Sequence, residues 1–70
     1  MNVHSHNLSK RETEVVELIL LGLTNKAIAE QLYVSERTVK FHCSNVYEKM
    51  RVSNRLELIL ELSEGKTYRF

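Results

Sequence analysis

Two short helical patterns follow one another within residues 24–42, with only a tight break between them, and this pair most constrains the fold. The first pattern begins after Thr24 and the second after Ser35, and both residue types are favoured N-caps. Tyr33 and Val34 form the break. The second pattern has one apolar side and one polar, basic side. The pair therefore predicts two helices joined by a sharp turn, of which the second is suited to the major groove of DNA.

Two further helices are expected, one on each side of this pair. Ser9 and Glu12 have the spacing of a capping box, which predicts a first helix running to about Leu21. Gly22 is a natural left-handed C-cap for that helix. The last helix is predicted over about residues 54–64. One side of the first helix is apolar and is expected to face the core, and it contains Leu8, Val15, Leu18, Ile19 and Gly22.

Composition supports an all-α chain of four helices, because the 70 residues include no Pro and only two Gly. We expect one domain, with a flexible arm at 1–7, a helix-turn-helix domain at 8–64 and a frayed tail at 65–70. The single Cys excludes an internal disulfide. No signal peptide is evident, and no apolar run approaches the roughly 20 residues of a membrane span. These features predict a cytoplasmic protein that needs no cofactor and is bound to the nucleoid when it engages DNA.

The net charge of +1 is small for a nucleic-acid-binding protein, so DNA binding must depend on where the charges lie. The buried stripe of the helix predicted over about 36–50 spans a narrow arc of the helical wheel and consists of Val39, Cys43, Val46 and Met50. The opposite side carries the predicted base contacts Lys40, Phe41 and Ser44. Lys40 can donate to guanine, and Phe41 can contact a thymine methyl group. Alternatively, Phe41 packs under the N-terminal arm and Lys40 is a solvated charge.

Phosphate contacts are predicted where the two central helices begin, because the helix dipole favours anions there. Thr38 lies in the first turn of one helix, and Asn25 and Lys26 begin the other. Residues 36–51 contain four basic and two acidic side chains, so this region is more positive than the chain as a whole.

The last helix carries more apolar surface than one core needs. Leu58, Ile59 and Leu62 form one stripe, and Leu56 and Leu60, continued by Ser63, form a second about 120° away. The second stripe predicts a homodimer in which this helix packs against its symmetry mate. Alternatively, a wide groove in the monomer covers both stripes.

The chain resembles the LuxR-type (FixJ/NarL/GerE) helix-turn-helix domain over about residues 8–62. The residues that carry the resemblance are Leu8-Ser9-Lys10-Arg11-Glu12, Gly22-Leu23-Thr24-Asn25-Lys26, Ile28-Ala29, Val34-Ser35-Glu36-Arg37-Thr38-Val39-Lys40, His42, Asn45 and Lys49-Met50-Arg51-Val52. The resemblance implies a bacterial transcription regulator that binds double-stranded DNA as a homodimer. RNA polymerase is a further expected partner if the regulator activates transcription.

The resemblance also implies roles for individual positions. Base contacts fall on Lys40, Phe41 and Ser44, and dimer contacts fall on Leu56 and Leu60. Contacts to the DNA backbone fall near Asn25, Lys26, Thr38, His42 and Lys49. We add as candidate backbone contacts Ser35, Arg37 and Arg51, which lie on the third helix or at its ends.

The chain also departs from the family pattern. Ala27 stands where the family usually has Glu, which predicts a weaker cap for the second helix. Phe41 stands where a smaller aliphatic or a charged residue is more usual, and Ser44 is often a larger donor. The operator sequence therefore does not carry over. Members often follow a receiver or ligand-sensing domain, so the chain is expected to be either a free-standing regulator or an excised effector domain.

Other functions receive less support from the sequence. His4 and His6 would need His42 or Cys43 to complete a metal site, but Cys43 is expected on the core side. Catalysis by Cys43 with His42 is disfavoured because neighbours on a helix point about 100° apart and no third orienting group is evident. We therefore predict no metal site and no enzyme. The main alternative is a helical module that binds a partner protein, which the near-neutral charge and the spare leucine stripe favour.

Overall fold

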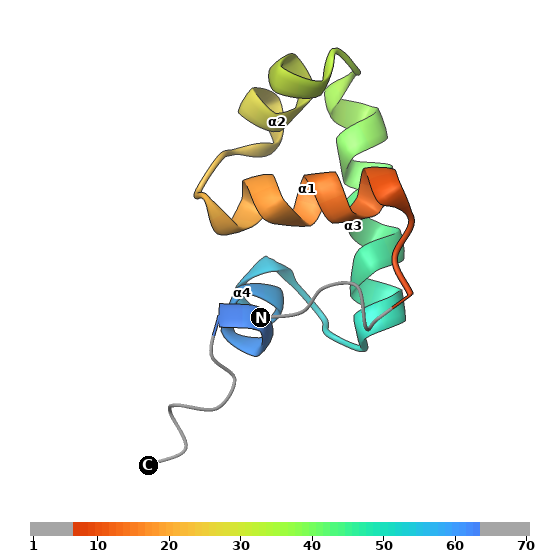
Figure 1. Ribbon diagram of the computed structural model, residues 1–70, viewed down its shortest axis with the longest axis vertical. Coiled ribbons are helices and arrows are strands. Elements are labelled where there is room, and N and C mark those ends of the chain that lie inside the picture. Colours follow the sequence, from red (N-terminus) through yellow and green to blue (C-terminus); the bar gives the residue numbers. More distant parts are fainter. Residues whose placement is uncertain (1–6, 64–70) are drawn as a thin grey trace.

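The fold consists of four α-helices and no β-strand within residues 7–63, the part of the chain that this computed structural model describes (Figure 1). The helices are α1 (Lys10–Leu20), α2 (Asn25–Leu32), α3 (Glu36–Met50) and α4 (Arg55–Ser63). The predicted all-α class and the order of the helices are thus confirmed. No helix in this range has both the length and the apolar character that crossing a membrane requires. The predicted N-terminal arm, except Asn7, and the predicted tail lie outside the described residues.

Local signals at both ends of α1 act as the sequence predicts. The Ser9 hydroxyl accepts from the Glu12 amide at 3.0 Å, and the Glu12 carboxylate accepts from the Ser9 amide at 2.9 Å, which completes the capping box. At the other end, Gly22 has φ +93°, and the Leu23 amide donates back to the Leu18 carbonyl at 3.1 Å. Because this left-handed conformation is open to glycine at little cost, the chain reverses without strain after α1.

A second reversal of the same kind joins α2 to α3, but it is built on a tyrosine. Tyr33 has φ 59°, and the next amide, that of Val34, donates to the Ala29 carbonyl at 3.0 Å. The Tyr33 side chain is 93% exposed, so packing does not compensate for the left-handed backbone. The α2 cap is also incomplete. Thr24 accepts from the Ala27 amide at 3.1 Å, but Ala27 has no carboxylate for the reciprocal bond, as expected from the sequence.

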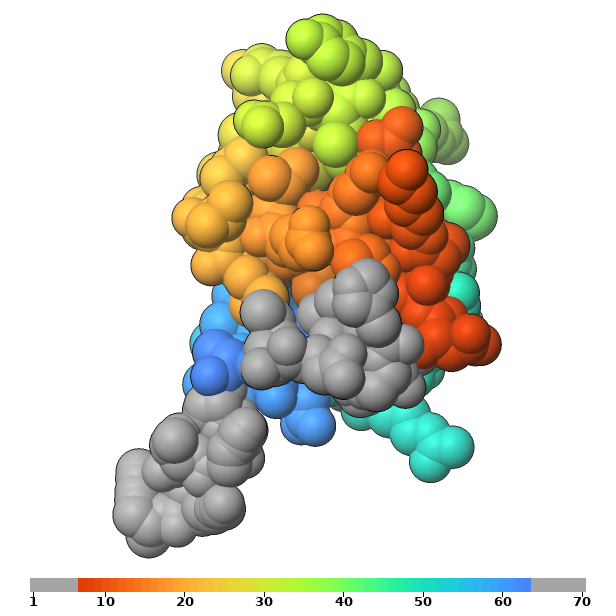
Figure 2. All heavy atoms as spheres, viewed as in Figure 1, coloured from red at the N-terminus to blue at the C-terminus, as the bar shows by residue number. Residues whose placement is uncertain are grey.

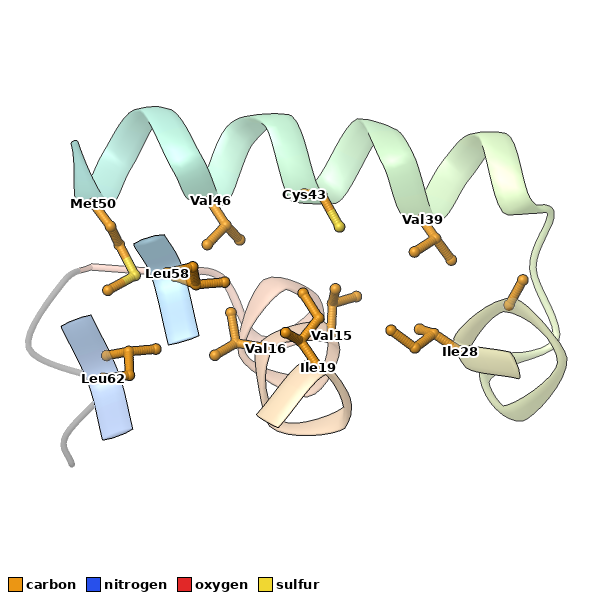
Figure 3. Packing of buried hydrophobic residues seen from close by; sticks show 11 residues of the cluster. Val15, Val16, Ile19, Ile28, Val39, Cys43, Val46, Met50, Leu58 and Leu62 are labelled. Carbon is orange, nitrogen blue, oxygen red and sulfur yellow. The ribbon is translucent and has the colours of Figure 1, made fainter. Parts of the chain in front are cut away.

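α3 is the element on which the other three helices pack (Figure 3). Val39 points toward Ile28 of α2, while Val46 points toward α1, and Met50 lies beside the two buried leucines of α4. All four residues of the predicted stripe, Val39, Cys43, Val46 and Met50, are buried. The buried side of α3 therefore crosses the whole core, which fixes the opposite side of the helix toward solvent.

The buried face of α1 is wider than the sequence pattern predicts. Val16 was not among the expected core residues, yet it is fully buried together with Val15 and Ile19. Leu18, expected inside, is only half-buried, and Gly22 is exposed. The reason is that α2, α3 and α4 all contact α1, so more of its circumference is covered than one stripe requires.

Candidate nucleic-acid interface

The outer side of α3 carries the three predicted base contacts on one exposed strip. Lys40, Phe41 and Ser44 are all exposed, and 62% of the Phe41 surface is open to solvent. Within residues 7–63 no hydrogen bond or ion pair engages the side chain of Lys40 or of Ser44. In Figure 2 the residues of α1 cover the middle of the molecule and α3 emerges along the right-hand edge. The arm proposed as an alternative cover for Phe41 lies outside the described residues, apart from Asn7.

His42 lies beside this strip in a more enclosed position. Its ring centroid is 5.8 Å from that of Phe41, and the residue is half-buried. Its Nδ1 is buried without a hydrogen-bond partner among the described residues. Nε2 is therefore the ring nitrogen that remains for a partner outside the chain, such as a phosphate oxygen.

The first turn of α3 is closed by two hydroxyl side chains. The Ser35 hydroxyl accepts from the Thr38 amide at 3.0 Å and donates its own proton to Thr38 Oγ1 at 3.0 Å. Since Thr38 Oγ1 accepts in this contact, its own proton remains free to be donated. The Thr38 hydroxyl is consequently oriented by Ser35 as a donor at a helix N-terminus, where an anion is favoured.

The first turn of α2 presents a second set of donors. The Thr24 cap takes the Ala27 amide, and the Ile28 amide bonds to the Thr24 carbonyl. The amides of Asn25 and Lys26 are left without an acceptor among the described residues. Lys26 is exposed, whereas Asn25 is half-buried and its Oδ1 accepts from Arg55 Nη1 at 3.1 Å.

The charged side chains that remain as candidate contacts to the DNA backbone differ in whether they already form an ion pair within the protein. Arg37 and Arg51 are exposed and have no ion-pair partner within residues 7–63. Lys49 instead lies 2.7 Å from the Glu12 carboxylate. An ammonium has three donors, so Lys49 can hold Glu12 and still donate to a phosphate.

Arg55 is the residue that the sequence reasoning missed. It is the first residue of α4, and its guanidinium donates both to Asn25 and to the carbonyl of Leu23, in the loop between α1 and α2. Leu58 and Ile59 stand three and four positions later, so no acid occupies the positions of α4 that face Arg55 one turn on. The sequence around Arg55 therefore carries no local signal that predicts its contacts, which span 30 and 32 residues.

The outer side of α4 carries two exposed leucines. Leu56 is 64% exposed and Leu60 is 48% exposed, whereas Leu58 and Leu62 are buried in the core. The Ser63 hydroxyl, in the same outer stripe, donates to the Ile59 carbonyl at 2.6 Å. Within the described residues, the alternative of a monomer groove that covers both leucine stripes is therefore wrong.

The residues considered for metal binding or catalysis do not form a cluster in the described part of the chain. Cys43 is buried among the core residues, and this burial raises the pKa of its thiol, although the charge of Arg55 and a contact with Tyr47 act in the opposite direction. A raised thiol pKa opposes nucleophilic chemistry at neutral pH. His4 and His6 lie outside the described residues.

A comparison with protein families matches residues 6–62 to the family described as "Bacterial regulatory proteins, luxR family". This match covers most of the chain, including all the residues of the candidate interface and both exposed leucines of α4.

Individual proteins are also similar to this chain over most of its length. The spore germination protein GerE of Bacillus subtilis is 46% identical over 55 residues, which are 79% of this chain and 74% of GerE. The transcriptional regulatory protein DegU of Brevibacillus brevis is 46% identical over 56 residues, which are 80% of this chain but 24% of DegU. The oxygen regulatory protein NreC of Staphylococcus carnosus is 44% identical over 52 residues, and again the match spans 24% of that protein. The chain thus matches most of GerE but only about a quarter of DegU and NreC.

Proposed function

Because this chain belongs to the luxR family of bacterial regulatory proteins, we propose that it binds DNA sequence-specifically as a regulator of transcription, with α3 in the major groove. The observation that carries this proposal is the placement of Lys40, Phe41 and Ser44 on the exposed side of a helix whose other side is buried in the core. Because the core fixes the orientation of this helix, the same three side chains face outward together whichever DNA sequence the protein encounters. Lys40 would donate to guanine O6 and N7, and Phe41 would contact a thymine methyl group.

The DNA backbone would be held on both sides of this helix. Asn25 and Lys26 at the start of α2 and Thr38 at the start of α3 offer donors at helix N-termini, which favour phosphate. Further along α3 and at its ends, the proposed backbone contacts are Ser35, Arg37, His42, Lys49 and Arg51. Such contacts fix the register of the protein on the duplex and leave the choice of sequence to the base contacts.

A homodimer through α4 is the proposed active form. The exposed Leu56 and Leu60 lie one turn apart, and burying them against a second copy removes apolar surface from water. Two recognition helices on a two-fold site multiply the discrimination that one helix achieves. If the regulator activates transcription, RNA polymerase is a further proposed partner in the bacterial cytoplasm.

The competing function is a helical module that binds another protein. The exposed leucines and the net charge of +1 favour it. The salt dependence of binding distinguishes the two functions. Binding to DNA through several phosphates should weaken by orders of magnitude between about 50 and 200 mM salt, because counterions are released. An apolar protein interface should respond little over the same range.

The experiment that tests the proposal is selection of bound duplexes from a random pool by the purified chain, at low and near-physiological salt. We expect an enriched two-fold sequence with half-sites about one helical turn apart. Enrichment of single half-sites would contradict the dimer but support sequence-specific binding. No enrichment at either salt concentration would contradict the proposed function and favour the protein-binding module.

A further inference from the structure

We infer that Arg55 is a positioning residue, which orients the Asn25 side chain and the first turn of α2 for phosphate binding. This inference rests on the proposed function, and it concerns a side chain on a different helix from every proposed contact to DNA. Arg55 begins α4, while Asn25 begins α2, and 30 residues separate them in the sequence.

The contact with Arg55 determines which way the Asn25 amide faces. Guanidinium nitrogens only donate, so the Asn25 side chain must turn its oxygen toward Arg55, and Oδ1 lies 3.1 Å from Nη1. The amide nitrogen of Asn25 then points to the other side. A phosphate oxygen only accepts, so the outward Nδ2 group is the end of the amide that DNA requires. Without Arg55, nothing on α4 would hold the amide in this orientation, and its oxygen could also turn outward.

The second contact of Arg55 holds the backbone of the same turn. The guanidinium also donates to the Leu23 carbonyl, one residue before the Thr24 cap of α2. This contact fixes the loop from which α2 starts, and hence the direction of the free amides of Asn25 and Lys26. A single planar side chain therefore holds the start of α2 at two points, which a flexible lysine would not reproduce.

Arg55 also connects two surfaces of the proposed regulator. The next residue, Leu56, belongs to the exposed stripe through which we propose dimerisation. The position of α4 and the phosphate-binding end of α2 are consequently coupled through one side chain. In a dimer, the spacing of the two phosphate sites would depend on this contact.

A double-mutant cycle with Arg55→Lys and Asn25→Ala tests the inference on the selected duplex. Arg55→Lys keeps the charge but loses the planar pair of donors. We expect each single variant to weaken binding about 3- to 10-fold, the range of one net hydrogen bond. The double variant should be weaker than Asn25→Ala alone, but by less than Arg55→Lys weakens binding on its own, because Arg55 acts partly through the Asn25 side chain and partly through the backbone of the same turn. The salt dependence of binding should stay unchanged, since no cation is removed.

Arg11→Lys is the matched control, because Arg11 is an exposed arginine of α1 that pairs with Glu14 and has no proposed role at DNA. It should leave binding unchanged. In the free protein, the side-chain amide resonances of Asn25 should move in Arg55→Lys and stay in place in Arg11→Lys. If Arg55→Lys unfolds, Arg55→Gln, which keeps a neutral donor, takes its place in the cycle.

Two results overturn the inference while the proposed function stands. Additive losses in the double variant would show that Arg55 acts independently of Asn25. A salt slope that falls by about 0.9 in Arg55→Ala would show that Arg55 itself contacts a phosphate. Failure of the unmodified chain to bind any duplex would instead overturn the proposed function and this inference together.

Discussion

Lys49 donates to Glu12 at 2.7 Å, and this contact joins the last turn of α3 to the first turn of α1 across 37 residues of sequence. The same carboxylate oxygen accepts from the Ser9 amide, so Glu12 both caps α1 and holds the end of α3. Burial raises the pKa of Glu12, but the hydrogen bonds and charge of Lys49 and the bonds with Ser9 outweigh it, so the pKa lies below its ordinary value of 4.5.

The Glu12 contacts should appear as a pH dependence of stability. A lowered pKa means that the unfolded chain takes up a proton first as the pH falls, so the contribution is present above about pH 4.5 and is lost as the pH falls through the folded-state pKa. We expect Glu12→Gln to lower the free energy of unfolding by about 1 kcal/mol at pH 7, a moderate value because Lys49 is exposed. Urea unfolding from pH 7 to 3 would show the difference shrinking at the acid end.

The control for this prediction is Glu14→Gln, which removes an exposed pair with Arg11 and should change stability by less than about 0.5 kcal/mol. A difference between Glu12→Gln and the unmodified chain that stays constant down to pH 3 would contradict the assignment.

Lys40 should contribute to sequence preference as well as to affinity. We expect Lys40→Ala to weaken binding to the selected duplex by roughly 1–3 kcal/mol and to relax the preference at one base pair, because a donor to a base edge is lost. Repeating the selection with the variant measures both effects. Lys10→Ala removes an exposed lysine from α1 and is the control. An equal loss on every sequence would reassign Lys40 to a phosphate.

Leu60 should be required for the dimer but not for the fold. Its side chain is 48% exposed, so Leu60→Glu places a charge on the proposed interface without opening the core. We expect sedimentation to show a monomer with unchanged helical circular dichroism. Leu62→Glu, two residues later in the buried stripe, should unfold the chain instead. An unchanged mass for Leu60→Glu would place the dimer contact on another surface.

Tyr33 should be a site at which stability can be gained. Its backbone is left-handed and its side chain has few contacts to lose, so Tyr33→Gly removes strain. We expect an increase of about 1 kcal/mol in the free energy of unfolding, less the entropy that glycine adds to the unfolded chain. Tyr33→Ala removes the ring but keeps the strained backbone, so it should give no such gain when the three proteins are compared by urea unfolding.

The sequence alone determined where the helices begin and how the third helix is oriented. Ser9, Thr24 and Ser35 each cap a helix as predicted, because a cap is a contact within three residues and needs no knowledge of the fold. The buried stripe from Val39 to Met50 could also be predicted from the sequence, since the period of a helix places these residues on one side.

Only the tertiary structure decided which polar side chains pair between different helices. Glu12 with Lys49 and Asn25 with Arg55 meet across 37 and 30 residues of sequence. No local pattern specifies such pairs, because they depend on the angles at which the helices pack. The burial of Val16 has the same origin, since it follows from α2, α3 and α4 all packing on α1. Sequence periodicity identifies a helix face, but only the packed fold determines how much of that face is covered and which charges remain for DNA.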